Sequence, residues 1–217
     1  MKALVPVGVS ALALTLTHGI AGHFIKGGAI VSLIPYLLGW ACAVIVFKIM
    51  VKVFPLTSPE EDEVREAPPK GASTRQRLMA VAVATPILVA VNVLLYLFSG
   101  DGEPRGGFEL LLAATIGVIL KPFLEEILFR YMYLKEMVHY GRYIYPIAIG
   151  VQATYFALWH DPKSLVFAFF GGVILGEVAA VSFDGTENGF RAGFVNALSV
   201  HVLHNLILYV IEGCVGH

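Results

Sequence analysis

The chain has 217 residues, of which 57% are hydrophobic and 14% are charged, and its mean hydropathy is +0.76. This composition fits a protein that crosses a membrane several times far better than a soluble domain. The net charge of −1 provides no basic surface, so nucleic acid is not an expected partner. The two cysteines, Cys42 and Cys214, have neither disulfide nor metal-ligand spacing, so redox chemistry is not indicated.

Residues 1–56 contain two apolar segments of roughly the length that a membrane-spanning helix needs, about 20 residues. The first segment, residues 3–20, is also compatible with a signal peptide, because Lys2 precedes it. We favour a retained helix, because the apolar run is long for a signal peptide. The second segment covers residues 29–53 and is followed by Pro55. The sequence thus predicts two transmembrane helices in this region.

Residues 57–77 carry mixed charges and prolines, a composition typical of a polar connecting loop. The rest of the chain, residues 78–217, is again apolar and is predicted to form a transmembrane core whose polar motifs lie within 108–211. The predicted spans of this core cover residues 78–98, 108–137, 143–159, 164–183 and 193–211.

Together these segments predict an all-α fold, a polytopic transmembrane helical bundle with about seven spans, or six if the first is cleaved. Helices are favoured because lipid leaves no other partner for backbone polar groups. Lysine and arginine are concentrated in the loops after the second, fourth and sixth spans. The positive-inside rule therefore places these loops, including 57–77, and the amino terminus in the cytoplasm.

The fourth predicted span contains Glu125, Glu126 and Arg130 within an apolar run. A charged side chain at the bilayer centre costs about 2.5–3.5 kcal/mol on insertion scales, so such residues generally have a function. Glu126 and Arg130 are four residues apart, the spacing of an ion pair on one helical face, whereas Glu125 is rotated by about 100°. Lys121 lies four residues before Glu125 and can reach it, in which case the glutamate stays ionised.

Other polar residues lie on later spans, with His160 ending the fifth and His201, His204 and Asn205 on the seventh. Glu125 lies 16 residues before Gly141 and His160 lies 18 residues after Arg142. At 1.5 Å per residue, their depths in an antiparallel pair of helices differ by only about 3 Å. The two side chains can therefore share one site.

These residues can supply the general base and the hydrogen-bond donors that hydrolysis of a peptide bond requires. Glu125 and His160 would hold and deprotonate a water, and His201 and Asn205, on one helical face, would donate hydrogen bonds to the oxyanion. His204 lies off that face and is expected to support or pack. A structural interpretation stays open, in which Glu126 and Arg130 staple the bundle and His160 caps a helix.

Three motifs occur in order along the core: Glu125-Glu126 with Arg130 as E-E-x-x-x-R, Phe156 with His160 as F-x-x-x-H, and His201 with Asn205 as H-x-x-x-N. In these motifs the sequence resembles the CAAX-protease and bacteriocin-processing family of intramembrane proteases, also called Abi. The resemblance covers about residues 108–211. It implies a protease of the glutamic type with the roles given above, in which the ion pair of the first motif braces its helix.

The resemblance leaves the cofactor open, because the family was long described as metal-dependent and a metal-free glutamate mechanism is the newer interpretation. We favour no cofactor, while zinc is possible with Glu125, His160 and His201 as ligands. Two departures from the family pattern are Lys121, where relatives tend to have a small or apolar residue, and Tyr131, where many have glycine.

The leading hypothesis is an intramembrane endopeptidase that cuts near a membrane anchor or a lipidated C-terminal segment of a membrane-anchored peptide or protein. The loop charges place His160 toward the outer face, which suits an enzyme of a bacterial or archaeal cytoplasmic membrane that trims exported proteins. One alternative is a non-catalytic bacteriocin-immunity or binding protein of the same fold. Another is a proton-coupled transporter, because buried glutamate and histidine also form proton relays.

Overall fold

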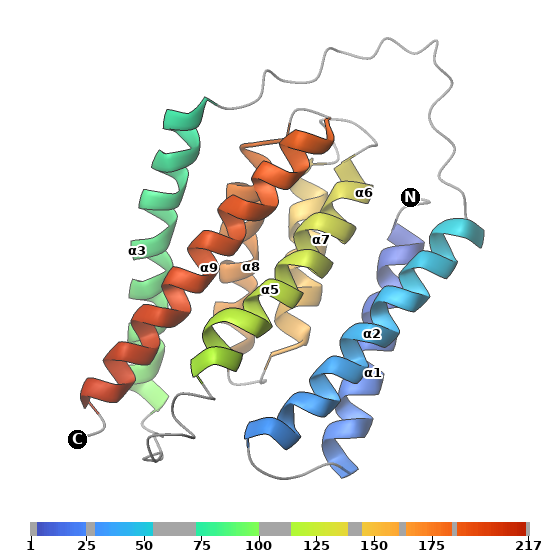
Figure 1. The fold of residues 1–217 in the computed structure, drawn as a ribbon, viewed down its shortest axis with the longest axis horizontal. Helices are drawn as coiled ribbons and strands as arrows, with labels where there is room; N and C mark the ends of the chain where they lie inside the picture. Colours follow the sequence, from blue (N-terminus) through green and yellow to red (C-terminus); the bar gives the residue numbers. More distant parts are fainter. Residues whose placement is uncertain are drawn as a thin grey trace.

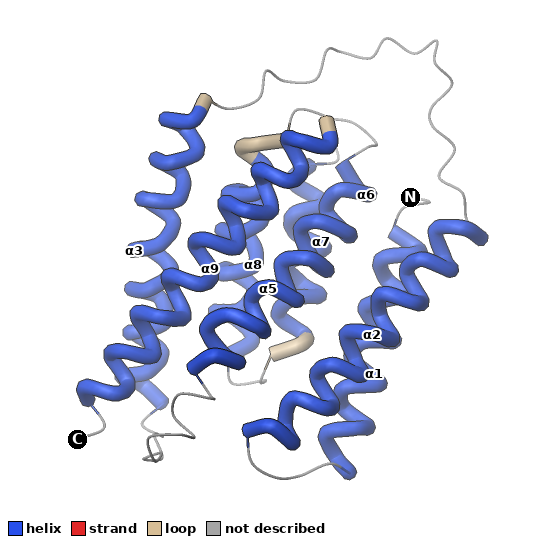
Figure 2. Tube along the Cα trace, viewed as in Figure 1, coloured by secondary structure: helices blue, strands red, loops and turns tan. Residues whose placement is uncertain are grey.

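The computed structural model describes residues 4–24, 29–53, 73–99, 114–138, 145–160, 164–183 and 186–215. All regular structure in these ranges is helical (Figures 1 and 2), which confirms the predicted all-α class for this part of the chain. The helices are α1 (Leu4–Phe24), α2 (Ala29–Val53), α3 (Thr74–Ser99), the continuous run of η1 (Thr115–Leu120), α5 (Lys121–Glu126), η2 (Ile127–Leu134) and α6 (Lys135–Val138), then α7 (Tyr145–Leu158), α8 (Leu165–Ala180) and α9 (Glu187–Val215).

Two helices begin earlier than the hydrophobic pattern predicts, because polar side chains cap their first turns. Ser73 and Gln76 form a capping box, in which each side chain bonds the backbone N–H of the other residue, at 3.3 and 2.8 Å. At the start of α9 the Gly189 N–H donates to the Thr186 hydroxyl at 3.1 Å. The end of the predicted loop 57–77 is therefore helical, whereas residues 54–72 lie outside the described part of the chain.

The helix that contains the first motif departs from regular α geometry. Segments η1 and η2 are π-helical and flank the short α-helical segment α5. At the junction the Lys121 N–H donates to the carbonyl of Ile116, five residues back. π-Helical turns of this kind are rare and often occur at functional sites. The beginning of the predicted span, residues 108–113, lies outside the described ranges.

The helix carrying α5 lies between the α1–α2 hairpin and the other helices (Figure 1), with α9 and α7 beside it on the side away from the hairpin. Helix α3 packs against α8 and α9. The side chains buried where these helices meet are mainly apolar, and Leu128, Phe129, Tyr133 and Leu134 are fully buried. This arrangement places α5 at the centre, where residues from three other helices can reach it.

Within the described residues, two helices are long and apolar enough to cross a membrane, with spans at Leu33–Met50 and Glu187–Ile211. Shorter apolar stretches cover Val5–His18, Leu78–Leu88 and Leu165–Ala180. By helix length and composition, the described residues thus support two of the seven predicted spans.

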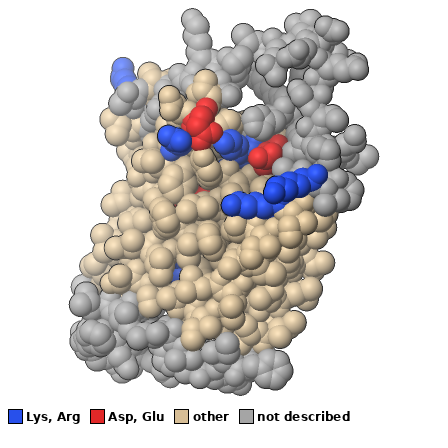
Figure 3. Space-filling model, turned by 45° about the vertical axis from the view of Figure 1, so that its right-hand side comes forward, with Lys and Arg blue, Asp and Glu red and all other residues tan. Residues whose placement is uncertain are grey.

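On the face shown in Figure 3, charged side chains gather toward one end, and a wide surface below them carries almost none. At this end α2 finishes near Lys52, α6 contains Lys135, and α9 begins with Glu187 and Arg191 (Figure 1). Helices α2, α6 and α8 therefore end on the same side of the bundle, as the alternating topology predicts.

Candidate active site

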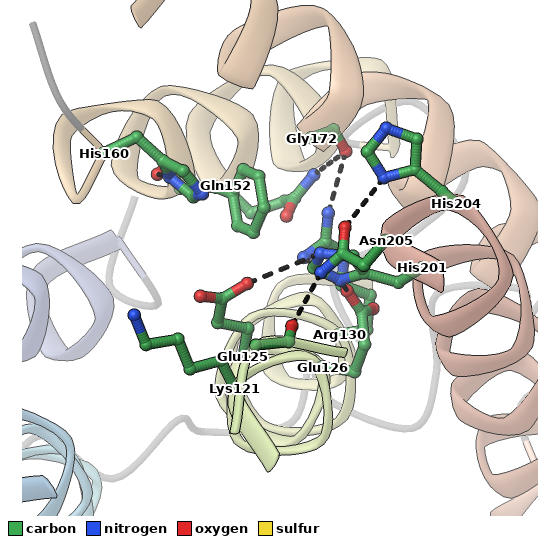
Figure 4. Close-up of polar contacts among 12 residues, drawn as sticks. Lys121, Glu125, Glu126, Arg130, Gln152, His160, Gly172, His201, His204 and Asn205 are labelled. Atoms are coloured by element: carbon green, nitrogen blue, oxygen red, sulfur yellow. Dashed lines mark hydrogen bonds and ion pairs between the residues drawn. The ribbon is translucent and has the colours of Figure 1, made fainter. Parts of the chain in front are cut away.

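Glu126 lies at the centre of a buried polar cluster that joins three helices. Its Oε1 atom is 3.1 Å from Nη1 of Arg130, and both side chains are fully buried. The same oxygen is 2.9 Å from Nδ1 of His201 on α9. Arg130 also donates from Nη2 to the carbonyl of Gly172 on α8 at 3.2 Å. The Glu126–Arg130 pair is thus part of a connection from α5 and η2 to both α8 and α9 (Figure 4).

Glu125 approaches the other nitrogen of the same imidazole. Its Oε2 atom is 3.6 Å from Nε2 of His201, while its Oε1 atom accepts a hydrogen bond of 2.8 Å from the hydroxyl of Tyr36 on α2. The residue is 6% exposed. Two neighbouring glutamates therefore face opposite nitrogens of His201 and hold the ring between them.

The contact with Glu126 determines which proton His201 carries. An ionised carboxylate can only accept a hydrogen bond, so Nδ1 of His201 must be the donor to Glu126. In the neutral ring, Nε2 then offers a lone pair. His201 can donate from Nε2 only as the doubly protonated imidazolium.

Asn205 lies one turn after His201 and is oriented from two sides. Its Nδ2 atom donates to the carbonyl of Gly117 in η1 at 3.0 Å, and its Oδ1 atom is 2.8 Å from Nδ1 of His204. The Gly117 carbonyl is open to this contact because the residue five positions later is Pro122, which has no N–H to donate. Pro122, three residues before the first motif, thus leaves an acceptor for the amide of the third motif.

His160 belongs to the same region through Phe156. Its Nδ1 atom is 2.7 Å from the Phe156 carbonyl, which can only accept, so this nitrogen carries a proton and Nε2 is the free acceptor of the neutral ring. The Phe156 ring lies 4.5 Å from the His160 ring and 5.9 Å from that of His201, centroid to centroid. The structure therefore brings His160 beside the Glu125–His201 pair without a direct hydrogen bond to either (Figure 4).

Lys121 does not form the ion pair with Glu125 that its spacing allows. Its ammonium nitrogen lies 5.4 Å from the centre of the Tyr36 ring, and no described carboxylate lies within ion-pair distance of it. A cation over an aromatic face is a stabilising contact. Lys121 is thus in contact with Tyr36, the residue that also bonds Glu125.

Two polar residues of this cluster escaped the sequence analysis, namely Tyr36 and Gln152. Gln152, fully buried on α7, donates to the same Gly172 carbonyl as Arg130, at 2.7 Å. For the contact of Gln152 the sequence does contain a signal. Gly172 and Gly176 on α8 form a small-x-x-x-small pattern, which indicates that another helix packs closely against α8 at this point. Tyr36 had no such signal, because a tyrosine in an apolar span is common.

The described residues contain no group of three histidine, cysteine, aspartate or glutamate side chains placed to hold a metal ion. The Nδ1 atom of His201 bonds Glu126 and that of His160 bonds a backbone carbonyl, so in each ring Nε2 is the nitrogen that a metal could take. The zinc ligands named from the sequence, Glu125, His160 and His201, are not grouped at ligand positions here, and zinc stays an untested alternative.

Comparison with protein families gives one match. Residues 107–207 match the family described as Rce1-like, type II CAAX prenyl endopeptidase Rce1-like. The matched segment includes all three motifs and the residues from η1 to most of α9, and it covers slightly less than half of the chain. No curated protein and no solved structure matches. This match agrees with the resemblance found in the motifs.

Proposed function

We propose that the chain is an intramembrane endopeptidase, because residues 107–207 match the Rce1-like family of type II CAAX prenyl endopeptidases. The members of this family are proteases, so the expected activity is hydrolysis of a peptide bond. Its substrate would be a peptide or protein held in the membrane by a prenyl group or another anchor near the scissile bond. The geometry of the site supports the roles that we propose for its residues.

The observation that carries the proposal is the position of His201 between two glutamates of different kinds. Glu126 is paired with buried Arg130, so its charge is balanced within the protein. Within the described residues, Glu125 has no guanidinium partner, and its polar contacts are the Tyr36 hydroxyl and the far nitrogen of His201. One carboxylate is thus structural, and the other is available to take a proton.

In this mechanism, Glu125 removes a proton from a water, and the oxygen of that water attacks the scissile carbonyl carbon. His160 supports the step with Nε2, which is the acceptor of its neutral ring because Nδ1 bonds the Phe156 carbonyl. The C–N bond then breaks, and the proton taken by Glu125 passes to the leaving nitrogen. Water and peptide are consumed, and a carboxylic acid and an amine are released.

The negative charge on the tetrahedral oxygen would be stabilised by His201 and Asn205. His201 would donate from Nε2 when both ring nitrogens carry a proton, and the carboxylate of Glu125, which has no guanidinium partner, would balance that charge. Asn205 has a second Nδ2 hydrogen, because only one is needed for the Gly117 carbonyl. Donors fixed in advance stabilise an oxyanion more than mobile ones do.

The outer surface of the bundle supports a location in lipid. Large apolar side chains are more than half exposed on several helices: Leu12 at 59%, Ile45 at 58%, Val166 at 59% and Val195 at 54%. Such extended apolar surface is unfavourable in water. We place all seven helices in the membrane, as an integral protein of a bacterial or archaeal cytoplasmic membrane, with the polar cluster facing the bundle interior.

The proposal is tested by cleavage of a farnesylated peptide with a C-terminal CAAX sequence by the purified protein. Replacing Glu125 with Gln is expected to lower kcat by about 10²–10⁴, the usual contribution of a general base. Glu136→Gln is the matched control, because Glu136 lies on α6, outside the site, and should leave kcat unchanged. Full activity of Glu125→Gln would exclude this mechanism, and no cleavage by the wild type would favour a binding protein.

The metal-free form of the mechanism has a test of its own. Prolonged treatment with a zinc chelator should leave kcat within about twofold of the untreated enzyme, because no step of the proposed chemistry needs a metal. Dialysed enzyme without chelator is the control. Activity that disappears with the chelator and returns with added zinc would show that a metal takes part.

A further inference from the structure

The α1–α2 hairpin lies outside the matched segment 107–207 but contacts the helix that carries Glu125. Tyr36 of α2 donates its hydroxyl hydrogen to Glu125 Oε1 at 2.8 Å and lies 3.3 Å from the Lys121 carbonyl. One turn later, Trp40 donates from Nε1 to the Leu124 carbonyl at 2.9 Å. The hairpin therefore reaches the candidate base directly, through a side chain, as well as through backbone contacts.

The ring of Tyr36 is held on several sides, so its hydroxyl has a defined position. The side chain is only 4% exposed. Its ring lies 4.9 Å from that of Trp159 and 6.1 Å from that of His18, centroid to centroid, and the Lys121 ammonium lies 5.4 Å from its centre. Aromatic contacts at these distances are stabilising. The hydroxyl is thus fixed by packing that does not depend on Glu125.

A carboxylate has two oxygens, and the hydrogen bond from Tyr36 occupies one of them. With Oε1 bound to Tyr36, Oε2 is the oxygen that faces His201, at 3.6 Å. Without the hydroxyl, the carboxylate can rotate about its last bond, and the two oxygens become equivalent. A general base must be held within hydrogen-bond reach of its proton, and small displacements of a reacting group lower rates strongly.

On the basis of these contacts, and resting on the proposed function, we propose that Tyr36 is a positioning residue for Glu125. It holds Oε1 so that Oε2 takes the proton from the attacking water. The α1–α2 hairpin is thereby a part of the active site, although it lies outside the segment that carries the three motifs. Tyr36 acts through Glu125 and does not itself touch the reacting atoms.

The test compares Tyr36→Phe with Tyr133→Phe in the peptide-cleavage assay. Both changes remove one hydroxyl at the interface between the hairpin and the same helix, because Tyr133 lies 2.6 Å from the Ser10 hydroxyl of α1. Only Tyr36 contacts the candidate base. We expect Tyr36→Phe to lower kcat by about 10- to 100-fold with KM changed less than about threefold, and Tyr133→Phe to leave kcat within about twofold.

A double variant separates positioning from general weakening of the structure. If Tyr36 acts through Glu125, the variant Tyr36→Phe/Glu125→Gln is no slower than Glu125→Gln alone, because the two effects are not additive. A multiplicative loss would overturn the proposal, as would equal losses of kcat in Tyr36→Phe and Tyr133→Phe or an unchanged kcat in Tyr36→Phe.

A spectroscopic measurement keeps this inference separate from the proposed function. If the wild type cleaves no peptide, or if Glu125→Gln is fully active, the proposed function fails. The hydrogen bond between Tyr36 and Glu125 can still be measured by infrared spectroscopy. The carboxylate band of Glu125 is identified as the one that disappears in Glu125→Gln. That band should shift in Tyr36→Phe and stay in place in Tyr133→Phe, and an unshifted band in both would overturn the positioning role.

Discussion

At the scale of single residues, the amide of Asn205 shows how two weak contacts determine a chemical role. A carbonyl oxygen can only accept, so the Gly117 carbonyl at 3.0 Å requires Nδ2 on its side, and His204 then faces Oδ1 at 2.8 Å. Turning the amide by half a turn would place Oδ1 against the Gly117 carbonyl, and that hydrogen bond would be lost. His204 is therefore expected to support Asn205 and not to take part in chemistry itself.

This assignment predicts a graded loss of activity. Asn205→Ala should lower kcat by about 10²–10³, the usual effect of removing one oxyanion donor. His204→Ala should lower it by only about tenfold, because the contact with Gly117 still orients the amide. Rates of peptide cleavage under single-turnover conditions measure both. Equal losses in the two variants would mean that His204 acts directly on the substrate.

At the scale of helices, α7 and α8 approach closely enough to bury the Gly172 carbonyl between Arg130 and Gln152. Glycine is required at this position, because a Cβ atom on Gly172 would lie 2.9 Å from the Cα atom of Ala153. One residue earlier, a Cβ atom on Gly171 would be in ordinary contact, 3.6 Å from a Leu88 methyl group. Neighbouring glycines of one helix thus have different constraints.

The change Gly172→Ala should therefore destabilise the protein by about 1–3 kcal/mol, the usual cost of forcing extra volume into a packed interior. The matched change Gly171→Ala should be neutral or slightly stabilising, because alanine favours a helix over glycine by about 1 kcal/mol. Thermal unfolding in one detergent, with Tm as the measurement, distinguishes them. A Tm of Gly172→Ala equal to that of the wild type would show that α7 and α8 can separate at little cost.

Helix α2 was predictable to its last residue because its apolar run is long and ends before Pro55. The early starts of α3 and α9 were missed because caps at Ser73 and Thr186 are made by polar residues that hydropathy assigns to loops. The spacing rule did indicate the contact between Glu126 and Arg130, since both lie within one turn. The contact of Tyr36 with Glu125 spans 89 residues and depends on how the hairpin packs, which no local pattern encodes.

At the scale of the whole molecule, the candidate site lies away from the end of the bundle where charged side chains gather. Helices α2, α6 and α8 end there (Figure 1), whereas α7 ends and α8 begins at the opposite end, close to His160. Lysine and arginine favour the cytoplasmic side of a membrane. The polar cluster is therefore expected nearer the outer face, where it could act on exported proteins.

This orientation predicts the labelling of single cysteines by a thiol reagent that does not cross membranes. In a background without Cys42 and Cys214, a cysteine replacing Ser164 at the start of α8 should react in intact cells. A cysteine replacing Arg191, whose side chain is 68% exposed near the start of α9, should react only after the cells are opened. Lysed cells are the control for reactivity of both sites. The reverse pattern would place the charged end outside and open the candidate site toward the cytosol, the side on which prenylated proteins are made.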